Sequence, residues 1–180
     1  MEKKLTKEQI LKSKKILFLS IFLIVLLVFL DSYTKFMAIS HLMDKDNIIL
    51  IPGVLELSFV KNTGAAFSFM GTHAGVFRII MGILTPIFLL AIIYLMVKIP
   101  KNKKMAPVYV IMIFVLSGAI GNYIDRMAKG FVVDFIYFSL IDFPVFNVAD
   151  IYITCSFFIL ILLILFCYKD EDFKWLTLKK

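Results

Sequence analysis

The sequence predicts an integral membrane protein, mainly α-helical, with four transmembrane helices and a small extracytoplasmic β-sheet, a cradle, at the outer membrane surface. Of the 180 residues, 61% are hydrophobic and only 18% are charged, and the mean hydropathy is +0.94. Soluble domains carry about a quarter charged residues. The apolar residues are also gathered into long uncharged runs, which places most of the chain in a bilayer.

Three uncharged runs are each long enough to cross a bilayer. They cover residues 79–97, 105–124 and 151–168. A spanning helix needs about 20 predominantly apolar residues. We therefore expect membrane helices at about 75–97, 105–127 and 147–168.

A fourth run, Ile16 to Leu30, is short for a span and closer in length to the core of a signal peptide. No small-residue cleavage site follows it, so we extend this helix through Asp31 and Lys35 and expect a span at about 16–39. Asp31 and Lys35 are four residues apart. They therefore share one helix face and can form an ion pair.

The basic residues predict how the helices are oriented. Fourteen of the 20 Lys and Arg residues lie in the N-terminal tail, in the loop between the second and third helices, and in the C-terminal tail. By the positive-inside rule both termini are cytoplasmic, and residues 1–180 form a single polytopic membrane domain. The net charge of +7 and the pI near 9.4 reflect this topology and contact with membrane lipid. They do not predict a nucleic-acid partner.

The cysteines and histidines predict neither a disulfide nor a metal site. Cys155 and Cys167 are twelve residues apart on one expected helix. That spacing separates them by about 18 Å along the axis, too far for a disulfide. The two histidines, His41 and His73, lie in loop regions, so we expect no metal and no cofactor.

Two outer segments have the sequences of short strands. Residues 54–61 partly alternate apolar and polar side chains, and residues 131–138 are rich in β-branched and aromatic residues. Pro144 marks a turn before the last helix. Two strands on one side of four helices indicate a small sheet at the membrane surface.

Four aspartates converge at the outer ends of the expected helices. Asp31 lies near the end of the first helix, Asp125 near the end of the third, Asp134 in the following loop, and Asp150 at the start of the fourth. Ionised carboxylates in or beside a bilayer core are costly, so each needs a partner or a task. Two carboxylates that come close can share one proton, which is the chemistry of an aspartic hydrolase.

Each polar residue also has a simpler structural role open to it. Asp150 could cap the fourth helix, Asp125 and Arg126 could form an interfacial ion pair, and Asn122 could hydrogen-bond between helices. Asp134 could be a solvated residue at a strand edge. Asp134 is the hardest to explain in this way, because apolar residues flank it on both sides.

Five motifs, in order along nearly the whole chain, resemble those of the bacterial signal peptidase II family of aspartic endopeptidases. The motifs are Asp31–Lys35, Asn62–Ser68, Gly121–Arg126, Gly130–Phe135 and Phe146–Asp150. No motif position departs from the family pattern. The resemblance implies that Asp134 and Asp150 are the catalytic dyad. It also implies a set of substrate-binding or supporting residues, namely Asn62, Asn122, Asp125, Arg126, Asn147, Asp31 and Lys35.

The resemblance further implies the substrate and the place of reaction. Members of this family remove the signal peptide of prolipoproteins, cutting just before a diacylglyceryl-modified cysteine, on the outer face of the bacterial cytoplasmic membrane. A short helix over the site is implied near residues 63–69. We prefer Asp134 over Asp125 as the partner of Asp150, because the adjacent Arg126 should keep Asp125 ionised and occupied.

This dyad predicts water-mediated cleavage without a metal or a covalent intermediate. The ionised carboxylate takes a proton from water, and the protonated one donates to the oxyanion and the leaving amine. The sequence assigns neither role. The alternative function is a non-enzymatic proton or ion pathway subunit, whose carboxylates would be spread through the depth of the bilayer. We expect a monomer.

Overall fold

The structure is a computed structural model that describes residues 7–64 and 74–176. Four helices and three strands make up most of it. The helices are α1 (Lys7–Leu42), α2 (Ala74–Lys98), α3 (Ala106–Lys129) and α4 (Val148–Phe166). The strands are β1 (Ile48–Ile51), β2 (Leu55–Asn62) and β3 (Val132–Tyr137). Short 3-10 helices precede and follow α4, at Ser139–Ile141 (η2) and Asp170–Leu176 (η3).

All four helices are long and apolar enough to cross a membrane, so the expected fold class is confirmed. Helix α1 is longer than predicted, because it begins at Lys7 rather than at residue 16 and ends at Leu42 rather than at residue 39. The residues before the apolar run are mostly Lys, Glu, Gln and Leu, which are good helix formers. Nothing there ends the helix, so it continues out of the membrane span.

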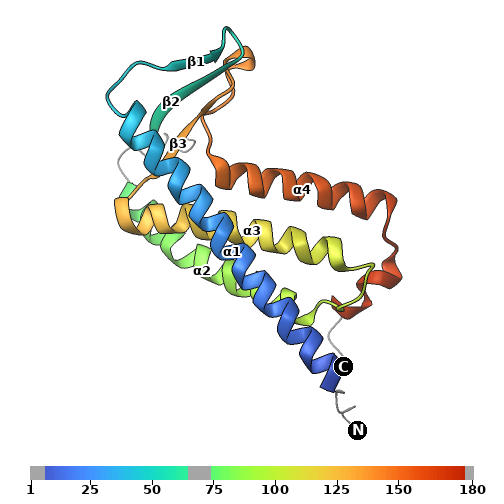
Figure 1. The fold of residues 1–180 in the computed structure, drawn as a ribbon. Helices are drawn as coiled ribbons and strands as arrows, with labels where there is room; N and C mark the ends of the chain where they lie inside the picture. Colours follow the sequence, from blue (N-terminus) through green and yellow to red (C-terminus); the bar gives the residue numbers. More distant parts are fainter. Residues whose placement is uncertain (1–6, 65–73, 177–180) are drawn as a thin grey trace.

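Helix α3 is the centre of the bundle (Figure 1). It packs against α1, α2 and α4, and more than half of its span is buried inside the protein. Pro107 stands in its first turn, where a missing N–H costs nothing. Gly130 ends the helix in left-handed backbone, with φ 83°, and donates its N–H to the Arg126 carbonyl. This stop directs the chain into β3.

The three strands form one antiparallel sheet in the order β1-β2-β3, near the C-terminal end of α1 and the start of α4 (Figure 1). Strands β2 and β3 lie in the two segments expected to be strands, whereas β1 was not expected. Its four residues, Ile48–Ile51, are consecutively apolar and all exposed, so they lack the alternation that marks a half-buried strand.

Packing and pairing fix β3 beside the bundle. Val133 and Phe135 pack against Ala38 and Leu42 of α1 in a small apolar cluster. In the β2–β3 register Val60 pairs with Asp134, and the last residue of β2 pairs with the first of β3. The polar side chains at the end of β2 therefore lie next to those at the start of β3.

The start of α4 is tied to the same sheet. Phe146 makes an isolated bridge to Ile136 of β3, with backbone hydrogen bonds in both directions. One residue later, Asn147 is the N-cap of α4 and forms a capping box with Asp150. Strand β3 and the start of α4 are thus held together beside α3.

Candidate active site

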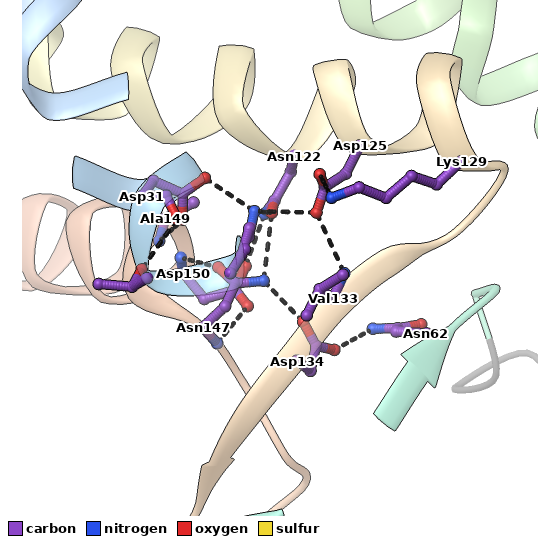
Figure 2. Close-up of polar contacts among 12 residues, drawn as sticks. Asp31, Asn62, Asn122, Asp125, Lys129, Val133, Asp134, Asn147, Ala149 and Asp150 are labelled. Atoms are coloured by element: carbon purple, nitrogen blue, oxygen red, sulfur yellow. Dashed lines mark hydrogen bonds and ion pairs between the residues drawn. The ribbon is translucent and has the colours of Figure 1, made fainter. Parts of the chain in front are cut away.

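Eight of the nine residues predicted for the site are joined by direct hydrogen bonds or ion pairs where α1, α3, β2, β3 and the start of α4 meet (Figure 2). The eight are Asp31, Lys35, Asn62, Asn122, Asp125, Asp134, Asn147 and Asp150. The ninth, Arg126, lies beside them on α3.

Lys35 is a buried ammonium at the back of the site. It forms the predicted ion pair with Asp31, at 2.8 Å from Nζ to Oδ2, and neither side chain has exposed surface. Nζ also donates to Asn122 Oδ1 at 2.8 Å and lies 3.5 Å from Asp125 Oδ2. A buried charge is tolerated only when it is paired and hydrogen-bonded. Acceptors from α1 and α3 meet that requirement here.

Asp31 joins α1 to two other helices. Its Oδ1 accepts the backbone N–H of Ala149, in the first turn of α4, at 2.9 Å. On α3, Gly121 faces the Asp31 carboxylate so closely that a Cβ would collide with Oδ2. One turn earlier, a Cβ on Gly118 would lie 2.6 Å from the Ala149 carbonyl oxygen. The two glycines therefore allow α1 and α4 to approach α3.

Asp125 is held by lysines, and the expected ion pair with Arg126 is wrong. Its Oδ1 lies 2.6 Å from Lys129 Nζ, one turn along α3, and its Oδ2 accepts the Val133 N–H at 3.1 Å. With Lys35 also close, both oxygens are occupied. Residues four apart face each other on a helix, whereas adjacent residues such as Asp125 and Arg126 do not.

Arg126 lies close enough to Asp150, Asp134 and Asp125 to interact with their charges. Its strongest charge interactions are with Asp150 and then Asp134, ahead of Asp125. Within the residues that the structure describes, no ion pair joins Arg126 to a carboxylate. It therefore supplies positive charge near the pair while its guanidinium donors are not committed to either of them.

Asp134 is a buried carboxylate on β3. Only 1% of it is exposed, so a solvated strand-edge role is wrong. Its Oδ2 accepts from Asn62 Nδ2 at 2.7 Å and its Oδ1 from Asn147 Nδ2 at 2.6 Å. Asn62 is itself oriented by the Gly64 N–H, which donates to Asn62 Oδ1 at 2.8 Å. Burial raises the pKa of Asp134 to about 6, and the charge of Asp150 acts in the same direction.

Asp150 stands in the first turn of α4, although Asn147, not Asp150, is the N-cap. Asp150 Oδ2 accepts the Asn147 N–H at 3.1 Å, and the Asp150 N–H donates to Asn147 Oδ1 at 3.1 Å. Its other oxygen accepts from Asn122 Nδ2 at 2.8 Å. A negative side chain at this position suits the helix dipole.

Two asparagine amides link the Asp134 and Asp150 carboxylates (Figure 2). Asn147 Nδ2 donates to Asp134 Oδ1 and also to Asn122 Oδ1, at 3.2 Å. Asn122 in turn donates to Asp150. Because Lys35 and Asn147 both donate to Asn122 Oδ1, the Asn122 amide can only present its N–H group to Asp150.

Four partners in this network were not predicted, and the first is the Gly64 N–H described above. Another is Lys129, which the sequence could have indicated by its spacing of four from Asp125. The other two are the backbone N–H groups of Val133 and Ala149, for which no sequence signal exists. The helix expected over the site near residues 63–69 falls mostly outside the described residues.

The four helices define a polytopic membrane protein. Its two linked carboxylates, one on a strand and one at a helix start, are the groups of an acid–base hydrolase. A family model described as signal peptidase (SPase) II matches residues 23–166. The chain belongs to the signal peptidase II family and is a membrane protease. Because the family is a protease family, the alternative function, a non-enzymatic proton or ion pathway subunit, is wrong.

Individual relatives agree with this family. A lipoprotein signal peptidase of Streptococcus pyogenes serotype M5 (strain Manfredo) is 36% identical over 152 residues, covering 83% of this chain and 93% of the relative. A bacterial membrane enzyme solved by the in meso method at 1.9 Å resolution has a TM-score of 0.70 and 31% identity, covering 83% of this chain and 94% of that chain. A second such enzyme, solved at 2.3 Å, has a TM-score of 0.67 and 29% identity, covering 89% and 93%.

Proposed function

We propose that this protein removes the signal peptide from prolipoproteins, cutting just before a cysteine that carries a diacylglyceryl group, and that Asp134 and Asp150 are its catalytic dyad. The observation that carries the proposal is the amide bridge from Asp134 through Asn147 and Asn122 to Asp150. The bridge holds two carboxylates from separate elements in one fixed arrangement.

The remaining carboxylates of the site are already neutralised. Asp31 and Asp125 are paired with Lys35 and Lys129. Among the described residues, only amide and backbone N–H groups donate to Asp134 and Asp150, with Arg126 nearby. Two neighbouring carboxylates with no paired cation favour sharing one proton. This is why the dyad is assigned to Asp134 and Asp150 and not to Asp125.

We assign the shared proton to Asp134 and the negative charge to Asp150. Burial raises the pKa of Asp134 to about 6, whereas Asp150 lies at a helix N-terminus. Asp150 then takes a proton from a water molecule, whose oxygen attacks the scissile carbonyl carbon. Asp134 donates a hydrogen bond to the developing oxyanion. When the C–N bond breaks, the leaving amine receives a proton from the dyad.

The proposal includes the placement of the protein in the cell. Both termini lie in the cytoplasm, the chain forms one polytopic domain, and the dyad lies on the outer face of the bacterial cytoplasmic membrane. The distribution of basic residues supports this orientation. Membrane lipid surrounds the protein, which acts as a monomer.

The test uses a lipidated prolipoprotein, purified enzyme variants and a gel shift that separates precursor from product. We expect Asp134→Asn and Asp150→Asn to abolish cleavage while the protein still inserts into membranes. Asp142→Asn is the matched control, because Asp142 is an exposed aspartate near the sheet in left-handed backbone that Asn also adopts. Full activity in either dyad variant would overturn the assignment.

A further inference from the structure

A groove between α3 and α4 belongs neither to the dyad nor to its supporting residues. Its volume is about 710 Å³. The walls are almost wholly apolar and include Ala106, Val110 and Phe114 from α3 and Ile151, Cys155 and Ile159 from α4. The two helices lie side by side along this stretch (Figure 1). The apolar wall lies within the parts of α3 and α4 that are long and apolar enough to cross a membrane.

One end of the groove is basic. Of the described residues that line it, Lys103, in the loop before α3, is the only charged one. Three neighbouring lysines have partners within the protein, and these pairs are Lys98 with Tyr94, Lys101 with Tyr109 and Lys104 with Asp172. Among the residues that the structure describes, Lys103 makes no hydrogen bond, ion pair or ring contact. Its charge is therefore free to bind a ligand at the mouth of the groove.

We propose that this groove binds one anionic glycerophospholipid, with its phosphate at Lys103 and an acyl chain along the apolar wall. From Ala106 to Phe114 the wall extends about 12 Å along α3, long enough for much of an acyl chain. Basic pockets between membrane helices on the cytoplasmic side are known to bind anionic lipid head groups. Lys103 lies in the loop that the orientation proposed above places on that side.

The charge of Lys103 also distinguishes lipid from the other apolar ligand that could enter the groove, a signal-peptide helix. The residues that precede the apolar core of a signal peptide are positively charged. They would lie at the same end of the groove as Lys103 and be repelled. A phosphate at that end is attracted instead, so the lipid is favoured.

Native mass spectrometry of the delipidated full-length protein provides the test. The protein is titrated with phosphatidylglycerol or with phosphatidylcholine of the same chains, and bound lipids are counted at each concentration. We expect one phosphatidylglycerol to bind more tightly than any phosphatidylcholine. Lys103→Gln should weaken it about fivefold, the contribution of one lysine near an anionic head group. Lys98→Gln, a charge loss on the same side of the protein but outside the groove, should leave the binding unchanged.

A second variant locates the lipid. Val110→Trp places a larger side chain in the groove and should lower the affinity for phosphatidylglycerol. Thermal unfolding of this variant and the wild type checks that the variant is folded. Equal binding of the two lipids would overturn the proposal, as would equal weakening by Lys98→Gln and Lys103→Gln. So would cross-linking of a signal peptide to Cys155 at the expense of lipid. Because lipid counts are read without substrate turnover, failure here is separate from failure of the dyad.

Discussion

Replacing Lys35 with Met removes the buried ammonium but keeps a side chain of similar length. Asp31 then loses an ion-pair partner at 2.8 Å, and Asn122 Oδ1 loses a donor at 2.8 Å. Asp125 keeps Lys129 at 2.6 Å, so the uncompensated charge is mainly that of Asp31. Removing one partner of a buried ion pair costs about 3–5 kcal/mol. We expect Lys35→Met to lower the free energy of unfolding by this amount.

A double-mutant cycle separates this electrostatic cost from a packing defect. Adding Asp31→Asn to Lys35→Met removes the stranded charge, while the new amide can still accept the Ala149 N–H. The double variant should therefore recover much of the lost stability. Denaturant titration in detergent micelles measures all three variants. Lys45→Met is the control, because Lys45 is exposed and such surface changes stay within about 0.5 kcal/mol. A loss below about 1 kcal/mol in Lys35→Met, or a double variant as unstable as the sum of the single ones, would refute the reasoning.

Two further predictions concern Asp134 and Gly121. The folded-state pKa of Asp134 is raised from 3.8 to about 6, so its contribution to stability is present at low pH and lost as the pH rises through about 6. The free energy of unfolding should fall over this window by up to roughly 3 kcal/mol in the wild type but not in Asp134→Asn, as followed by thermal unfolding from pH 4 to 8. Gly121→Ala should cost about 1–3 kcal/mol by overpacking against Asp31, whereas Gly82→Ala, with only ordinary contact at 3.7 Å, should stabilise by about 0.5–1 kcal/mol. The same stability for both glycine variants would contradict the close approach of α1 to α3.

The elements with strong local patterns were predictable from the sequence. The membrane helices follow from uncharged runs, and β2 and β3 follow from alternation and from β-branched residues. Strand β1 was missed, since Ile48–Ile51 owes its conformation to pairing with β2 and not to burial of one face. Local sequence thus indicates an element where its own composition or periodicity is distinctive, and β1 has neither signal.

The sequence was enough to predict which residues form the site, but not which hydrogen bonds and ion pairs join them. Asp31 and Lys35 were paired correctly because their spacing of four is a local rule. The bond between Asn147 and Asn122 joins residues 25 positions apart and depends on how α4 packs against α3, which no spacing reveals. The error over Asp125 arose from reading adjacency along the chain as contact, although Lys129 was the residue on the correct helix face.

The two hydrogen bonds of the Asn62 side chain couple the Asp134 carboxylate to the backbone just after β2. The Gly64 N–H holds Asn62 Oδ1 and thereby turns Asn62 Nδ2 toward Asp134. If the peptide at Gly64 rotates, the Asn62 amide loses this constraint and can present its oxygen to Asp134. A carboxylate facing that oxygen would hold its proton more tightly. The backbone conformation at Gly64 thus controls the proton affinity of Asp134 through one side-chain amide, that of Asn62 at the end of β2.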